Sequence, residues 1–230
     1  MIRKLLLVLT VCLAVVSCKQ NDIALYNGAP RLEFTSNISC IFDDTDYVNK
    51  VAEKDFEAEI RLIGLPLSDT KTYAMLCVAH PLYGEGIVPE ITFSNPYTFP
   101  VEKSVIKAAF KVKRPKNVRA SHVGRLAFDM ENAQHEFEAG RKEHTTPDIE
   151  VRTNINQHGI RWSWNQDLWG LYSTNKYIFM MDNLGKTYDQ IPQTTEEVIK
   201  VGKLYQEYRK NNPPLLDDEK DASEIYFPTH

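Results

Sequence analysis

An alternation of apolar and charged residues in the run Phe56-Glu-Ala-Glu-Ile-Arg-Leu62 constrains the fold of this chain more than any other feature. Successive side chains of an extended chain point to opposite faces, so a period of two places the four apolar residues on one face. Gly64-Leu-Pro66 then interrupts the run with residues typical of a turn. The pattern predicts a half-buried strand, and such a strand needs a sheet with one face packed on a core.

The strand-like pattern recurs up to about residue 153 and favours a mainly β fold. Further short segments, separated by glycine, proline or charged residues, lie at 73–80, 91–93, 106–112, 123–130 and 149–151. No long helical pattern interrupts them, so we expect an antiparallel sandwich of immunoglobulin-like type over residues 31–155. The Cys…Trp…Cys pattern of true immunoglobulin domains is absent from the sequence. Because segment 73–80 is the most continuously apolar, we expect it near the middle of a sheet.

The character of the sequence changes over residues 156–230, which predict a Trp-rich segment and a small α-helical C-terminal region. Ser173 or Thr174 can cap the start of a first amphipathic helix, and Gly185 can supply the left-handed residue that ends it. Thr194 and Glu197 have the spacing of a capping box ahead of an apolar stripe, which predicts a second helix.

The N-terminal segment predicts export. Basic residues in Met-Ile-Arg-Lys4 precede a run from Leu5 to Val16 that is apolar except for Thr10. Twelve helical residues extend about 18 Å, which is too short for a hydrocarbon core of about 30 Å. We therefore interpret residues 1–17 as a cleaved signal peptide rather than a transmembrane helix.

The end of this signal, Val15-Val-Ser-Cys18, resembles the lipobox of bacterial lipoproteins. The resemblance implies that a diacylglycerol is joined to the Cys18 thiol, that further acylation, for example by palmitate, follows, and that the chain is cut before this residue. Residues 18–30 are then a lipidated tether, since several acyl chains hold a protein to a bilayer far longer than one chain does. The alternative is an ordinary secretory signal that is cut after Ser17 and leaves a free cysteine.

Charge and cysteine content exclude some function classes. Of the 27 basic residues, Arg3 and Lys4 leave with the signal, so 25 basic and 31 acidic residues remain, and nucleic acid is not an expected partner. Cys40 and Cys77 remain for the folded region, and the sequence leaves open whether they form a disulfide. No Cys/His cluster has zinc spacing, and we expect neither a metal nor a cofactor.

The sequence contains no short catalytic motif. It lacks a Gly-x-Ser-x-Gly elbow, a His-Glu-x-x-His motif, a phosphate-binding glycine loop and a dinucleotide fingerprint, so we do not expect an enzyme. Asp43-Asp-Thr-Asp46 is dense in carboxylates, but Val48 stands where a calcium loop would need an oxygen ligand, and a solvated turn is the better interpretation. A hydrolase that uses two dispersed carboxylates remains an alternative.

All three tryptophans, Trp162, Trp164 and Trp169, fall within eight residues. In a strand, Trp162 and Trp164 would face the same way, and such a pair of flat rings can stack on a sugar or hold a peptide side chain. Packing between the sheet and the helices is the competing interpretation and the one that we favour.

A resemblance to a known family rests on the motif Leu168-Trp-Gly-Leu-Tyr-Ser-x-x-Lys-Tyr-x-Phe179, together with the lipobox and the strand Phe56 to Ile63 that ends in Gly64. The segment from Leu126 to Met130, followed by a loop through Phe137, also matches. The chain resembles Bacteroidetes lipoproteins of unknown function that are encoded beside outer-membrane importers of the starch-utilisation type (SusC/SusD-like). The resemblance implies a location on the outer face of the outer membrane, beside a TonB-dependent barrel and its substrate-binding lipoprotein lid.

We therefore expect a non-enzymatic accessory lipoprotein of a surface nutrient importer. It would help to capture or deliver oligopeptides or oligosaccharides, or it would brace the complex. A surface hydrolase without a short motif and a structural or adhesin-type module are the alternatives.

Overall fold

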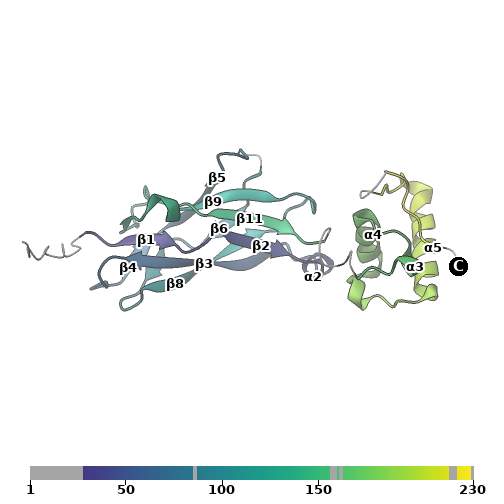
Figure 1. The fold of residues 1–230 in the computed structure, drawn as a ribbon, viewed down its shortest axis with the longest axis horizontal. Coiled ribbons are helices and arrows are strands. Elements are labelled where there is room, and N and C mark those ends of the chain that lie inside the picture. Colours follow the sequence, from purple (N-terminus) through teal and green to yellow (C-terminus); the bar gives the residue numbers. More distant parts are fainter. Residues whose placement is uncertain (1–27, 85–86, 156–159, 161–162, 218–221, 229–230) are drawn as a thin grey trace, which may run out of the picture.

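The structure, a computed structural model, describes residues 28–84, 87–155, 160, 163–217 and 222–228. A two-sheet β-sandwich is followed along the long axis of the molecule by a group of helices (Figure 1). Strand β1 (Arg31–Phe34) begins at the end of the sandwich that lies farthest from the helices. The expected order of a mainly β region and a C-terminal helical region is confirmed.

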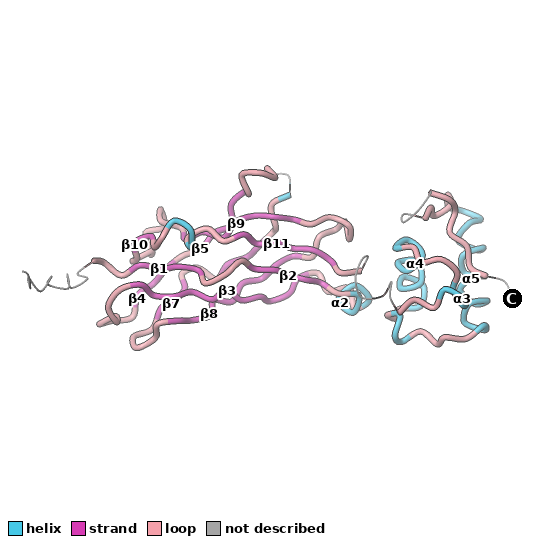
Figure 2. Tube along the Cα trace, viewed as in Figure 1, coloured by secondary structure: helices cyan, strands magenta, loops and turns pink. Residues whose placement is uncertain are grey.

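The strands form two main sheets and one small ribbon, drawn in magenta in Figure 2. One sheet has the order β10-β1-β3-β8-β6, the other has the order β2-β11-β9-β5, and β4 pairs with β7. The bounds of the strands after β1 are β2 Ile38–Phe42, β3 Glu53–Ile63, β4 Lys71–Tyr73, β5 Met75–Ala79, β6 Ile91–Phe93, β7 Tyr97–Phe99, β8 Val105–Lys113, β9 His122–Phe128, β10 Glu138–Ala139 and β11 Asp148–Thr153.

The core of the sandwich lies between the two main sheets and follows the predicted alternation. In β3, Ala58, Ile60 and Leu62 are buried, while the charged residues between them are exposed. The same face continues across the sheet, because Ile60 pairs with Phe34 of β1 and with Ile106 of β8. Facing residues from the other sheet complete the core, and they include Cys40, Leu126, Phe128, Ile149 and Val151.

Segment 73–80 is not one central strand, and that expectation is wrong. The chain changes sheets at Ala74, so Tyr73 ends β4 opposite Tyr97 while Met75 begins β5 opposite Phe128. Strand β5 is an edge strand, and Val78 is 40% exposed. The apolar run reflects burial by two different neighbours in succession rather than burial on both faces of one sheet.

The expectation of a purely antiparallel sandwich is also wrong in two places. Strand β2 pairs in parallel with β11, and β1 pairs in parallel with β10, which lies inside the highly charged segment 131–146. Strands β1 and β2 are separated by only Thr35–Asn37, and this short break carries the chain from one sheet to the other. After the switch, β2 runs in the same direction as β11, the last strand of the sandwich, and the two strands therefore pair in parallel.

Four α-helices are described. Their bounds are α2 Asp44–Val48, α3 Gln166–Trp169, α4 Thr174–Leu184 and α5 Thr195–Asn211, and short 3-10 turns span Lys142–His144 and Tyr188–Gln190. The caps follow the sequence closely. Ser173 accepts a hydrogen bond from the backbone of Lys176, and Gly185 ends α4 in the left-handed conformation at φ 62°. The Thr194 side chain caps α5, but the Glu197 carboxylate pairs with Lys200.

Helices α3, α4 and α5 share a second apolar core that is separate from the core of the sandwich. Its largest fully buried side chains are Trp169 and Tyr177, and Met180, Val198 and Val201 pack with them. The C-terminal segment closes this core, because Ile225 and Phe227 are buried against it.

The cysteine question left open by the sequence is answered for this structure. Cys40 and Cys77 are both free thiols, and they lie on β2 and β5, the two outer strands of the four-stranded sheet. Burial raises the pKa of Cys40 to about 12 and that of Cys77 to about 11. In the part of the chain that the structure describes, no helix has the length and apolar character required to cross a membrane.

Candidate functional site

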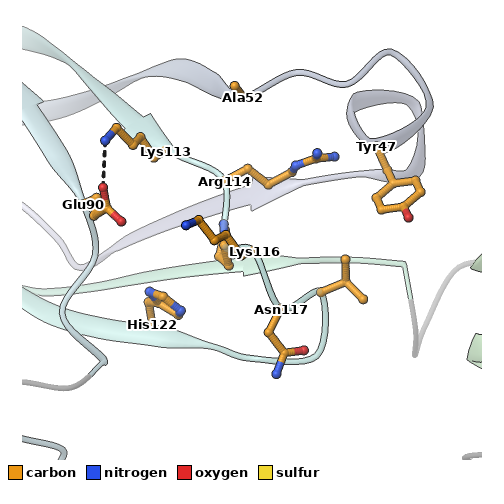
Figure 3. Close-up of a pocket in the computed structure, with 10 residues that line it drawn as sticks. Tyr47, Ala52, Glu90, Lys113, Arg114, Lys116, Asn117 and His122 are labelled. Atoms are coloured by element: carbon orange, nitrogen blue, oxygen red, sulfur yellow. Dashed lines mark hydrogen bonds and ion pairs between the residues drawn. The ribbon is translucent and has the colours of Figure 1, made fainter.

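A cavity of ≈ 600 Å³ lies at the end of the sandwich that faces the helices. Its walls come from α2, from the starts of β3 and β6, and from the connection between β8 and β9 (Figure 3). The lining residues are Tyr47, Ala52, Glu90, Lys113, Arg114, Pro115, Lys116, Asn117, Val118 and His122.

Local sequence explains how α2 forms one wall. Asp43 and Asp46 form a reciprocal capping box, in which each carboxylate accepts a hydrogen bond from the other residue's backbone N–H. The four-residue acidic segment is therefore a helix cap, and the carboxylates that could have suggested calcium are used to start α2. The short helix presents Tyr47 to the cavity.

Local sequence also explains the opposite wall. The alternation of β8 ends at Lys113, whose backbone N–H donates to the Glu90 carbonyl at 3.0 Å. The next residue, Arg114, donates its backbone N–H to Ala52 at 2.9 Å, and Pro115 then removes a donor and stops the strand. The connection that leads to β9 thus leaves the sandwich at the cavity.

Neutral groups hold the Arg114 side chain. A terminal guanidinium nitrogen donates a long hydrogen bond of 3.4 Å to the Asp46 carbonyl, and the guanidinium carbon lies 5.2 Å from the centre of the Tyr47 ring. The carboxylate of Asp46 is paired instead with Lys54 at 2.9 Å. Figure 3 shows Arg114 extending toward Tyr47.

The remaining charges make the cavity basic. Lys113 donates to the Glu90 carboxylate at 2.8 Å, and this contact lowers the pKa of Glu90 and raises the pKa of Lys113. Lys116 and Arg114 form no ion pair with the residues described, and His122 adds an imidazole. An acidic chain with a net charge of −4 therefore concentrates cations at this end of the sandwich.

The helical region supports this wall of the cavity. Tyr47 donates its hydroxyl to Asp182 of α4 at 3.0 Å, and Tyr177 of α4 donates to Asp44 of α2 at 2.7 Å. Burial, with Asp182 adding to it, raises the pKa of Tyr47 to about 12. In the β8–β9 connection, Arg119 donates to the Asn175 side chain of α4 at 2.6 Å. Both walls of the cavity are thus tied to the same helix.

The tryptophans pack inside the helical core. Trp169 is fully buried and donates its indole N–H to Gln193 at 2.9 Å. Trp164 is 8% exposed, donates to the Gly170 carbonyl at 2.7 Å and stacks on Tyr188. It lies in irregular structure before α3 and not in a strand. These two rings pack within the helical core and not between the sheet and the helices. Trp162 and the lipidation site Cys18 lie outside the described residues.

Sequence reasoning did not single out the cavity. The one local signal is the basic run Lys111-Val-Lys-Arg-Pro-Lys116, which is equally typical of the solvated end of a strand. No group of three or more His, Cys, Asp or Glu side chains that could hold a metal ion occurs in the described part of the chain.

No protein-family model matches the sequence, and no curated protein matches it. Among solved structures, the apo Calx CBD1 domain is similar at 9% identity and a TM-score of 0.36, over 55% of this chain and 99% of that one. A Bacteroides ovatus GH5 xyloglucanase in complex with a heptasaccharide is similar at 7% identity and a TM-score of 0.28, over 56% of this chain and 20% of that one. Bacteroides thetaiotamicron EndoBT-3987 is similar at 10% identity and 0.33, over 54% of this chain and 32% of that one. These likenesses assign no function.

Proposed function

We propose that the protein is an accessory, surface-exposed outer-membrane lipoprotein of a starch-utilisation-type, TonB-dependent importer. In this role it helps to capture or deliver oligopeptides or oligosaccharides, or it braces the complex. The observation that carries the proposal is the placement of the cavity. The chain enters the sandwich at β1, at one end of the long axis, and the basic cavity lies toward the other end, beside the helices. A lipid on Cys18 would thus anchor the end opposite to the one that presents the cavity.

The strand order supports a binding module. The core strands of one sheet follow the order β1-β3-β8-β6, and those of the other follow β11-β9-β5. If β1, β3, β5, β6, β8, β9 and β11 are lettered A to G in chain order, the first sheet reads A-B-E-D and the second reads G-F-C. This arrangement matches the ABED and CFG sheets of an immunoglobulin-like domain, and we propose that architecture for the sandwich. In variable immunoglobulin domains the loops at one end of the sandwich bind ligands. The cavity likewise lies at one end.

The lining of the cavity favours binding over catalysis. Glycoside hydrolysis uses two carboxyl groups that face the scissile bond. The lining residues include one carboxylate, Glu90, and it is engaged by Lys113. Cations and one aromatic ring make up most of the remaining chemistry, and in ligand pockets a few placed polar groups of this kind fix the orientation of the ligand and provide specificity.

Copurification tests the importer role. The native outer membrane is extracted with a mild detergent, the protein is captured through a C-terminal affinity tag, and the proteins that accompany it are identified by mass spectrometry. We expect a TonB-dependent barrel and its lipoprotein lid in stoichiometric amounts. A Cys18→Ser variant, expressed at the same level, is the matched control and should lose both. Recovery of the wild-type protein alone, or with unrelated proteins only, contradicts the proposal.

A further inference from the structure

We propose that the basic cavity binds a carboxylate group of an anionic oligomer, with Arg114 and Lys116 as the cations that recognise it. The binding follows from the geometry of the cavity, whereas its role in nutrient capture rests on the function proposed above. The chain's own groups do not supply the counter-charge, and the cavity is large enough for more than the carboxylate alone.

The charge of the cavity lining favours an anionic ligand. Besides Lys113, which Glu90 already neutralises, the lining contains Arg114 and Lys116. Neither has a carboxylate within ion-pair distance among the described residues. The carboxylate of Asp46 is paired with Lys54, and Arg114 contacts the backbone carbonyl of Asp46. Glu90, which is paired with Lys113, acts on Lys116 only as a Coulombic neighbour. An anionic ligand would supply the missing counter-charge, and charge-assisted hydrogen bonds are roughly twice as strong as neutral ones.

The fixed orientation of the Arg114 side chain favours binding of a carboxylate. A guanidinium presents a planar fork of donors that matches a carboxylate, so it gains most when its orientation is fixed before binding. Arg114 is fixed on one side by the Asp46 carbonyl and by the Tyr47 ring. Tyr47 is fixed in turn by Asp182. Arg114 therefore loses less conformational entropy on binding than an unsupported surface arginine would.

The volume of the cavity indicates a ligand larger than a single carboxylate group. Ligand pockets of proteins typically span about 300–1,000 Å³, and this cavity of ≈ 600 Å³ lies within that range. A lone carboxylate would fill only part of it. Tyr47, Ala52 and Val118 provide apolar wall beside the cations, where the rest of an oligomer can pack. The ligand class is therefore an oligomer that carries a carboxylate, either a peptide with its free C-terminus or an oligosaccharide of uronic acids.

Calorimetric titration of the full chain, purified in a neutral detergent, tests the proposal and separates the two sources. One arm compares trigalacturonate with neutral maltotriose, and the other compares Ala-Ala-Ala with its C-terminal amide. We expect saturable binding of at least one carboxylate ligand, no binding of its neutral partner, and weakening with added salt because exposed charges are screened. Binding in one arm only identifies the source.

Charge-removing variants locate the binding. Arg114→Gln together with Lys116→Gln should weaken the binding by about tenfold or more, since both charge-assisted hydrogen bonds to the carboxylate are lost. Lys116→Gln alone changes only an exposed residue, so it keeps the test valid if the double variant fails to fold. The matched control is Lys103→Gln with Lys203→Gln, which removes two exposed lysines elsewhere and should bind as wild type does.

Three results would overturn the proposal: no carboxylate ligand binds, both cavity variants bind as tightly as wild type, or the control pair loses affinity equally. The copurification experiment is independent of all three. A protein that binds carboxylates but purifies without an importer contradicts the importer role alone. A protein that purifies with an importer but binds no carboxylate contradicts the carboxylate site alone.

Discussion

Tyr47 of α2 donates its hydroxyl to Asp182 of α4 at 3.0 Å, across 135 residues of sequence. The same two helices are joined in the opposite sense by Tyr177 of α4, which donates to Asp44 of α2 at 2.7 Å. Because the Tyr47 ring also lies under the Arg114 guanidinium, the contact connects the helical region to the cavity of the sandwich. The C-terminal helices therefore support the candidate binding site as well as their own core.

This connection predicts that a residue outside the cavity influences binding inside it. Asp182→Ala should lower the affinity for a carboxylate ligand a few-fold and the free energy of unfolding by about 1 kcal/mol, because one hydrogen bond of Tyr47 is lost. Calorimetric titration and urea unfolding measure the two effects. A double-mutant cycle with Tyr47→Phe isolates the interaction energy of the Tyr47–Asp182 pair. The exposed Asp189→Ala serves as the control and should change neither quantity. Additive effects of Tyr47→Phe and Asp182→Ala would refute the connection.

Glu33 gives the sandwich a predictable sensitivity to acid. Its side chain is fully buried and accepts hydrogen bonds of 2.9 Å from the backbone N–H and the guanidinium of Arg141. The side-chain hydrogen bond from Arg141 lowers the pKa of Glu33 to about 2. A lowered pKa contributes stability above the unfolded value near 4.5 and loses it as the pH falls toward 2.

We therefore expect Glu33→Gln to be less stable than wild type by about 1–3 kcal/mol at pH 7, because it removes a buried charged acceptor. The difference should shrink between about pH 4.5 and about pH 2, as the wild-type carboxylate also becomes neutral. Urea unfolding at pH 7 and pH 3 measures it, and the exposed Glu131→Gln is the control. A difference that stays constant with pH would show that the ionised carboxylate is not the source of the stability.

The lipobox resemblance predicts that Cys18→Ser abolishes lipidation. Only the cysteine thiol can form the thioether, so the variant should take up no radiolabelled palmitate and should leave the membrane fraction on alkaline washing. Cys77→Ala, which changes a free thiol of the folded region, is the control and should keep the label. A wild-type protein without label would instead favour the secretory signal that is cut after Ser17.

Local signals in the sequence predicted the elements well. The alternation in β3 and β8 needs only the period of an extended chain, and the caps at Ser173, Gly185 and Thr194 involve residues within three or four positions of each other. Pairing partners are set by contacts between distant segments. The switch of sheets at Ala74 depends on where Tyr97 and Phe128 arrive, and nothing in the apolar run 73–80 encodes that position.

The candidate site shows the same limit. The cations near Arg114 were visible as a basic run, but a basic run is equally compatible with a solvated surface. What distinguishes the cavity is Tyr47, which lies 67 positions earlier in the chain, and Asp182, which lies 68 positions later than Arg114. The tryptophans were conspicuous in composition, yet for Trp164 and Trp169 their neighbours in space determine that they pack in the helical core.

Lys176 is a buried cation in the helical core. The side chain is 2% exposed, and its Nζ donates to the carbonyls of Trp169 at 3.0 Å and Leu171 at 2.8 Å. The Tyr226 ring centre lies 5.1 Å from this nitrogen. Burial lowers the pKa of Lys176 to about 8, although Asp217 opposes the shift.

The lowered pKa of Lys176 predicts a stabilising contribution of this residue in mild alkali. The raised pKa values of Cys40 and Cys77 act in the opposite direction, so the contribution is measured as the difference between wild type and Lys176→Met. Between about pH 8 and the unfolded pKa near 10.4, the unfolded chain binds more protons at this residue than the native chain, so the contribution of Lys176 to the free energy of unfolding increases with pH. From pH 7 to pH 9.5 the free energy of unfolding of wild type should rise by about 2 kcal/mol relative to that of Lys176→Met. Urea unfolding of both proteins at both pH values measures the gain as a difference, in which the ionisation of unfolded cysteines and tyrosines cancels. The exposed Lys203→Met is the matched control and should follow wild type, whereas equal pH dependence of Lys176→Met and wild type would show that the buried amine does not titrate with a lowered pKa.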